Sequence, residues 1–231
     1  MDHVPLLFAE SVVRLCDFRA FSSLVSIHSR ISLFGNVSRS LLDKGLCVTL
    51  NVVYIPAAGT FDYCLTCRQN YGFFWSATPY TFDPADYRFI LFFEVNLLKD
   101  KSLMSVEQTW TTATPSDPTF LKLLKAPFPQ TELRLDFKCP ELLKLLPDYY
   151  TFNYISAYGA FAYNEVFDAI IQRSQECGRL ERLYCTEFFE KRGIEASIDW
   201  IATNKRLRMI SGICIENPES VRSTLNRLGV Q

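Results

Sequence analysis

The spacing of apolar residues changes at Gly45, and this change restricts the fold more than any other feature of the sequence. Before Gly45, apolar side chains recur every three or four positions, which is the period of an α-helix with one buried face. From residue 46 they alternate with polar side chains, which is the period of a β-strand. We therefore expect residues 4–44 to be helical and a β-sheet to begin at residue 46.

The helical segment divides into three short helices at residues that favour helix ends. Pro5 stands at the first position of the first helix, where its missing N–H would have no partner within the helix. Asp17 is a suitable N-cap for the second helix. Lys44 and Gly45 are typical of a helix end and close the third helix.

The next part of the chain predicts three strands. Residues 46–55 and 61–67 both alternate, and the turn-type sequence PAAGT lies between them. These two segments are therefore expected to form an antiparallel hairpin. Residues 88–97 predict a third strand. The Thr- and Pro-rich segment 109–118 is expected to be a long loop.

From about residue 118, helical and extended segments alternate to the end of the chain. The expected helices are 117–124, 139–146, 164–177, 194–203 and 217–229, and the expected strands are 131–137, 150–156, 179–185 and 206–215. Such alternation predicts parallel strands joined by crossover helices. The fold class is therefore α/β, or α+β. It divides into a helical module over residues 1–45 and a mixed recognition domain over 46–231, with a strand-rich part (46–108) and an alternating part (117–231).

The alternating part contains a weak repeat. Leu180 and Leu183 fit the start of a leucine-rich unit, and Leu207 and Ile210 follow them after 27 residues. Leucine-rich repeats have periods of about 20–29 residues. The earlier strands are spaced less evenly, so the repeat is degenerate. An ordinary α/β sheet whose strands begin with leucine is the alternative.

Composition and charge exclude several classes of function. With 24 Lys and Arg against 25 Asp and Glu, the chain lacks the basic excess of a nucleic-acid surface. It has no apolar run of about 20 residues that could cross a bilayer, and Asp2 stands where an export signal has basic residues. We therefore expect a cytoplasmic or nuclear protein that binds neither nucleic acid nor membrane. Its eight cysteines are expected to be reduced.

No catalytic, cofactor or metal site is expected. Cys64 and Cys67 form a C-x-x-C pair, but no second pair follows, and the pair lies on an expected strand where positions three apart point to opposite faces. His3 and His28 are the only histidines. Phosphate-binding glycine motifs and nucleophile motifs are absent from the sequence. The chain is therefore predicted not to be an enzyme.

The aromatic-rich segment 71–80 allows two interpretations. Aromatic side chains most often pack in the core. They also act as anchors in protein interfaces. The sequence leaves both possibilities open for this segment.

The first forty residues resemble a divergent F-box, and the whole chain resembles the large nematode families of F-box and F-box-associated proteins. The residues that carry this resemblance are Val4, Pro5, Phe8, Val12, Leu15, Asp17, Phe18, Phe21 and Leu24. Leu6 and Leu7 stand where F-boxes usually have an acidic residue. The tryptophan common near the end of the third F-box helix is also absent.

The resemblance implies a function in protein interaction. It implies that a Skp-family adaptor binds the helical module, for which Pro5, Leu6, Phe8 and Leu24 are the candidate contacts. Val12, Phe21 and Phe34 are expected to face the core. The remaining domain would then recognise an unknown protein target for a cullin-type ubiquitin ligase.

Two alternatives remain from the sequence. One is a scaffold or binding protein whose F-box serves only as a structural cap, since repeat domains need capping elements. The other is a small cysteine-dependent enzyme that uses Cys64 or Cys67.

Overall fold

The fold comes from a computed structural model. It describes residues 6–15, 33–69, 77–83, 89–104, 108–126, 128, 131–135, 139–146, 150–158, 164–210, 213–215 and 217–230. The chain divides into two compact units, which we describe separately. Unit 1 comprises Met1–Thr49, Leu65–Phe93 and Phe128–Gln130, and unit 2 comprises Leu50–Cys64, Glu94–Pro127 and Thr131–Gln231.

Unit 1 contains the helices expected at the start of the chain. The described helices are α1 (Leu6–Leu15) and α3 (Leu33–Lys44). They pack together around a small apolar cluster, against which Phe34 also packs as expected. The cluster consists of Ala9, Val13, Val37, Leu41 and Leu91. The expected middle helix lies outside the described residues.

Gly45 lies at the point where α3 ends and the sheet begins. A Cβ atom at this position would lie 2.5 Å from Cδ1 of Leu91 and 2.6 Å from the carbonyl oxygen of Leu41. Side chains do not tolerate approaches this close. Glycine is therefore favoured here chiefly because the backbone carbonyl of Leu41 leaves no room for a Cβ atom, and the change of period coincides with this close packing.

The expected hairpin is confirmed. Strand β1 (Leu46–Ile55) and strand β2 (Thr60–Gln69) are neighbours in the sheet, and Gly59 has φ +63° in the turn between them. Strand β4 (Ile90–Leu98) is the expected third strand. Two short strands also pair antiparallel with β2: β3 (Thr78–Pro79) and β5 (Thr111–Ala113).

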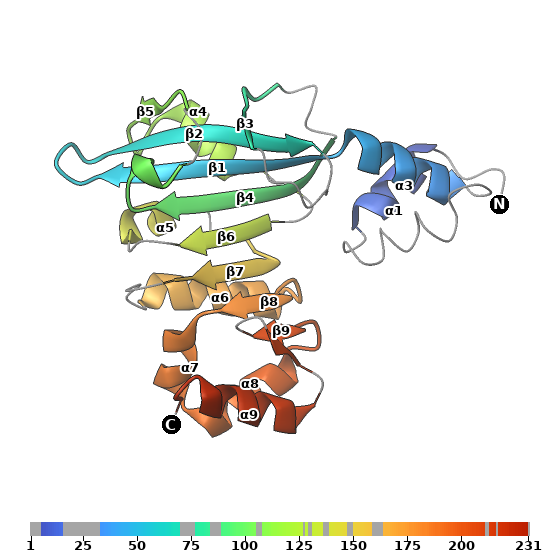
Figure 1. The fold of residues 1–231 in the computed structure, drawn as a ribbon, viewed down its shortest axis with the longest axis vertical. Coiled ribbons are helices and arrows are strands. Elements are labelled where there is room, and N and C mark those ends of the chain that lie inside the picture. The colour runs from blue at the N-terminus through green and yellow to red at the C-terminus, as the bar shows by residue number, and fades with distance from the viewer. Residues whose placement is uncertain are drawn as a thin grey trace. The chain divides into compact units, whose positions relative to one another are not determined.

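Ten strands of the described residues form one mixed sheet in the order β10-β9-β8-β7-β6-β4-β1-β2-β3, with β5 also paired to β2 (Figure 1). The remaining strands are β6 (Thr131–Leu135), β7 (Tyr154–Ala157), β8 (Arg182–Tyr184), β9 (Met209–Ile210) and β10 (Ile213–Cys214). Strands β6 to β9 are parallel. In β8 and β9, Leu183 pairs with Ile210, which is the 27-residue spacing noted in the sequence.

Helices connect the parallel strands of unit 2, as the alternating pattern predicts. The connecting helices are α5 (Pro140–Leu145), α6 (Glu165–Glu176), α7 (Thr186–Arg192) and α8 (Ile194–Thr203). Helix α4 (Pro118–Leu124) precedes β6, and α9 (Pro218–Arg227) follows β10. Figure 1 shows α6 behind β7 and β8. Among the described residues, no helix combines the length and the apolar character needed to span a bilayer.

Local caps fix where several of these helices begin. The side chains of Asp117, Asn164 and Asn217 each accept a backbone N–H three residues later, at 2.9 Å. Each of these bonds satisfies an N–H that has no partner inside its helix. The expected starts of α4, α6 and α9 are therefore confirmed.

Three expectations were wrong in part. Segment 109–118 is not entirely a loop, because its β-branched Thr111 and Thr112 pair with β2 in strand β5. Segment 206–215 is not one strand but the antiparallel pair β9 and β10, with Ser211-Gly212, a turn-type pair, between them in the sequence. Helix α7 was not expected, because its adjacent Phe188 and Phe189 show no helical period.

Buried asparagines hold the turns that precede the parallel strands. The side-chain oxygen of Asn153 accepts the backbone N–H of Thr131 at 3.2 Å and a guanidinium N–H of Arg179 at 3.1 Å. Its amide donates to the carbonyl of Arg179 at 3.4 Å. Asn204 similarly accepts the backbone N–H of Leu207 at 3.2 Å. These side chains therefore add to the backbone hydrogen bonds that join the same segments, such as the 2.9 Å bond from the N–H of Asn153 to the carbonyl of Thr131.

Candidate interaction surface on the sheet

Among the described residues, the parallel strands of unit 2 have one covered face and one open face. Successive residues of a strand point to opposite faces. Leu133, Ile155, Leu183 and Ile210 are at most 1% exposed and form the covered face. We define the open face as the alternate positions, which are Glu132, Arg134, Tyr154, Ser156, Tyr158, Arg182 and Tyr184.

The register of the strands sets these side chains in two rows. In the first row, Tyr154 of β7 lies between Glu132 and Arg182. In the second, Ser156 lies between Arg134 and Tyr184. Neighbouring strands are about 4.8 Å apart, so side chains within a row are in contact range.

Arginines and tyrosines of the open face contact one another. The guanidinium carbon of Arg182 lies 4.8 Å from the ring centre of Tyr154, and that of Arg134 lies 5.3 Å from the ring centre of Tyr158. Tyr158 stacks on Tyr184 with ring centres 4.7 Å apart. These distances suit cation–π and stacking contacts. They form a continuous series from Arg134 through Tyr158 to Tyr184.

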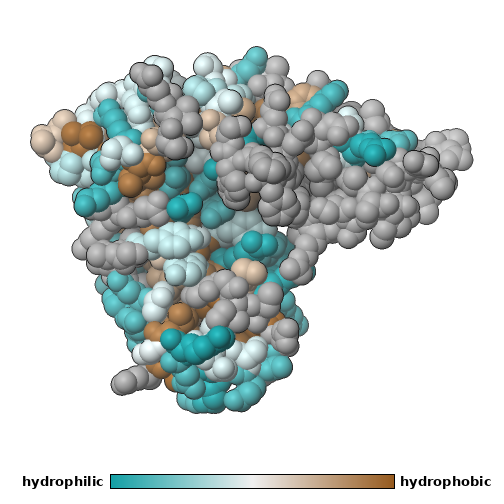
Figure 2. All heavy atoms as spheres, in the orientation of Figure 1, coloured by the Kyte–Doolittle hydropathy of each residue, from teal (hydrophilic) through white to brown (hydrophobic). Residues whose placement is uncertain are grey.

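The stacked tyrosines remain exposed. Tyr158 is 38% exposed and Tyr184 is 36% exposed. In Figure 2, the surface where the strands lie in front of α6 shows mostly pale and teal atoms, so weakly to strongly hydrophilic residues gather there. The open face is therefore an accessible surface of mixed aromatic and polar character.

Glu132 lies half-buried at the base of this surface. Burial, and after it the negative charge of Glu94, raise the pKa of its carboxyl to about 7. Arg134, Arg182 and a hydrogen bond from Ser156, whose Oγ is 3.5 Å away, act in the opposite direction. The carboxyl is therefore only partly ionised at neutral pH, while both arginines are exposed and charged.

Of the four candidate adaptor contacts, the structure describes the side chain of only one. Phe8 is 56% exposed on α1. Leu6 begins the same helix, but its side chain lies outside the described set, as do Pro5, Leu24 and Phe21. Val12, expected in the core, is half-buried.

The C-x-x-C cysteines lie on β2, as expected. Cys64 and Cys67 are both buried. Burial raises the pKa of the Cys64 thiol to about 11, although a hydrogen bond with Asn51 and the charge of Lys101 act in the opposite direction. Within the described ranges, no three His, Cys, Asp or Glu side chains are grouped so that they could hold a metal ion.

The open face was not predicted from the sequence. The sequence does contain the pattern of this face, because polar or aromatic residues occupy every second position of segments 131–135, 154–158 and 182–184. The alternation alone predicts which residues share a face of one strand. The contacts between strands depend on the register, which the sequence does not reveal.

Comparison of the chain with protein-family models, with curated proteins and with solved structures found no match. The features of this chain that bear on its function are therefore the open face, the exposed side of α1 and the resemblance of the first forty residues.

Proposed function

We propose that this chain is a non-enzymatic protein-interaction protein that binds a protein target on its open face. The observation that carries the proposal is the exposed stack of Tyr158 on Tyr184 with Arg134 beside it. Tyrosine and arginine are the residue types most enriched among the few that dominate binding energy in interfaces. Large rings held in place by stacking also lose little conformational freedom when a partner binds.

The architecture supports this use of the sheet. Parallel sheets are normally covered on both faces. Repeat domains of the leucine-rich type instead leave the strand face accessible and use it for binding. We therefore propose that unit 2 is a degenerate leucine-rich-repeat-like domain and that its open face recognises the target.

The resemblance to F-boxes supplies the second part of the proposal. The chain would be a substrate-recognition subunit of a cullin-type ubiquitin ligase, with the helical module bound to a Skp-family adaptor. Helix α1 buries Ala9 and Val13 and leaves Phe8 exposed. A large exposed aromatic side chain on a small helical module suits a docking contact.

The scaffold alternative keeps the open face as a binding surface but gives the helical module a purely structural role. The enzyme alternative is disfavoured, because a nucleophilic cysteine acts as a thiolate and burial keeps Cys64 protonated at neutral pH.

The adaptor part is tested by co-purification with a Skp-family adaptor and a cullin. We expect the full chain to retain both proteins and Phe8→Asp to lose them, because a charge in a desolvated contact is penalised. Leu6→Asp and Leu24→Asp should behave in the same way. Asn36→Asp, at an exposed position of α3, is the matched control and should retain binding. If the unmodified chain retains no adaptor, the scaffold alternative holds.

A further inference from the structure

We propose that the open face binds an extended peptide segment in which an acidic side chain lies within about three residues of an aromatic or large aliphatic side chain. This inference rests on the proposed function, because it names the kind of target segment that the same face would take.

The most exposed charged groups of the open face are positive. Arg134 and Arg182 are both exposed, whereas Glu132 and the neighbouring Glu94 are half-buried. A guanidinium binds a carboxylate through two parallel hydrogen bonds, which gives both strength and orientation. The complementary partner is therefore anionic at the point where it meets these arginines.

The rings of Tyr158 and Tyr184 form an apolar surface next to the charge of Arg134. Arg134 lies over Tyr158, and Tyr158 stacks on Tyr184. A segment that sets a carboxylate on Arg134 would therefore bring a nearby side chain over the exposed tyrosine rings. Arg134 and Tyr184 stand two strands apart, about 10 Å, which three residues of an extended peptide span.

A nucleic acid is the competing class of ligand, since bases also stack on tyrosine. The composition favours a peptide, because the whole chain has a net charge of −1, without the basic excess of nucleic-acid-binding domains.

The test uses the full chain and a phage-displayed library of random peptides of about twelve residues. Enriched peptides are synthesised, and their affinities are measured by fluorescence anisotropy. We expect enrichment of Asp or Glu within three residues of an aromatic or large aliphatic residue. Affinity should fall about tenfold or more in the double variant Arg134→Gln/Arg182→Gln, because charge-assisted bonds are lost. Arg227→Gln, at an exposed position of α9, is the control and should change nothing.

Four other outcomes would overturn the inference. Peptides that lose binding in Tyr158→Ala/Tyr184→Ala but lack acidic residues would reject the acidic segment and leave the proposed function standing. Peptides whose binding no open-face variant changes, or the absence of any enriched peptide, would reject both. A random twelve-nucleotide RNA that binds more tightly than the peptides, and depends on the two arginines, would assign the face to nucleic acid. Circular dichroism of each variant verifies that it is folded.

Discussion

Glu132 is an acidic side chain whose surroundings favour its protonated form. Its pKa rises from 4.5 to about 7, chiefly through burial. A carboxyl with a raised folded-state pKa holds its proton more tightly in the folded than in the unfolded chain. The stability associated with this proton is complete below pH 4.5 and is lost as the pH rises through about 7.

Replacing Glu132 with glutamine should therefore stabilise the protein at high pH. Each unit of pKa shift corresponds to about 1.4 kcal/mol, so we expect Glu132→Gln to gain at most roughly 3 kcal/mol at pH 8. The gain should shrink to near zero at pH 4.5. Urea unfolding from pH 4.5 to pH 8 measures this, with Glu190→Gln on the exposed side of α7 as control. A difference that does not depend on pH would contradict the assignment.

Four of the described cysteines should differ strongly in reactivity. Burial raises the pKa of Cys64 and Cys139 to about 11 and that of Cys185 to about 12. Cys177 is exposed. Because the thiolate is the reactive form, iodoacetamide at pH 7.5 should label Cys177 well before the other three, as peptide mass spectrometry would show.

The control for this labelling experiment is the same reaction in urea, where all four thiols should react at similar rates. Cys177→Ser should remove the early product without changing the others. Rapid labelling of Cys64 in the native protein would show that β2 opens readily, and it would restore the enzyme alternative to consideration.

At the scale of elements, Asn153 joins the turns before successive strands. Asn153→Ala would leave the backbone N–H of the buried Thr131 and part of the Arg179 guanidinium without their partner. An unsatisfied buried polar group costs about 1–3 kcal/mol, so we expect a loss of roughly 2–4 kcal/mol in the free energy of unfolding. Urea denaturation measures it. Asn226→Ala, at an exposed position of α9, should change stability little.

The sequence predicts elements well where their determinants are local. Asp117 caps α4 through an N–H only three residues away, and Gly178, with φ +62°, ends α6 as expected. The open face depends on longer connections. Glu132, Tyr154 and Arg182 become neighbours only through the register of three strands, and no local signal sets that register. The raised pKa of Glu132 has the same origin, because it results from burial and from Glu94 on another strand.

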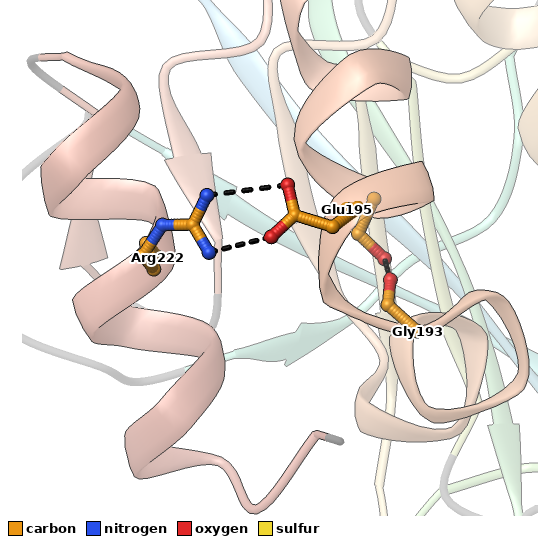
Figure 3. A network of polar contacts seen from close by, with 4 residues as sticks. Gly193, Glu195 and Arg222 are labelled. Atoms are coloured by element: carbon orange, nitrogen blue, oxygen red, sulfur yellow. Dashed lines mark hydrogen bonds and ion pairs between the residues drawn. The ribbon is translucent and has the colours of Figure 1, made fainter.

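At the scale of the whole chain, α9 covers the C-terminal end of unit 2. It packs against α8, and Arg222 forms an exposed pair with Glu195 through contacts of 2.6 and 3.2 Å (Figure 3). The covered side of α9 carries Val221 and Leu225, which are 3% and 0% exposed. The apolar side, rather than the exposed ion pair, is therefore expected to hold the helix in place.

Leu225→Ala should destabilise α9 and the elements next to it more than the rest of unit 2. Removing most of a buried leucine side chain costs about 2–5 kcal/mol. The parallel strands pair only with their neighbours, so amide exchange should accelerate most in α8, α9 and β9 and least in β6. Hydrogen exchange with mass spectrometry resolves this gradient. Ser223→Ala, on the exposed side of α9, is the control. An equal loss of amide protection from β6 to β9 in Leu225→Ala would instead show that unit 2 unfolds as a whole.

The short strands at both ends of the sheet bear on self-association. A long free strand edge is a template on which other chains add, and such addition leads to fibres. In the described residues the sheet order ends at β10 and at β3, each only two residues long, and β3 contains Pro79, which has no N–H to donate. A second molecule could form few backbone hydrogen bonds at either end. The protein can therefore hold a broad sheet with one open face while offering little edge for polymer growth.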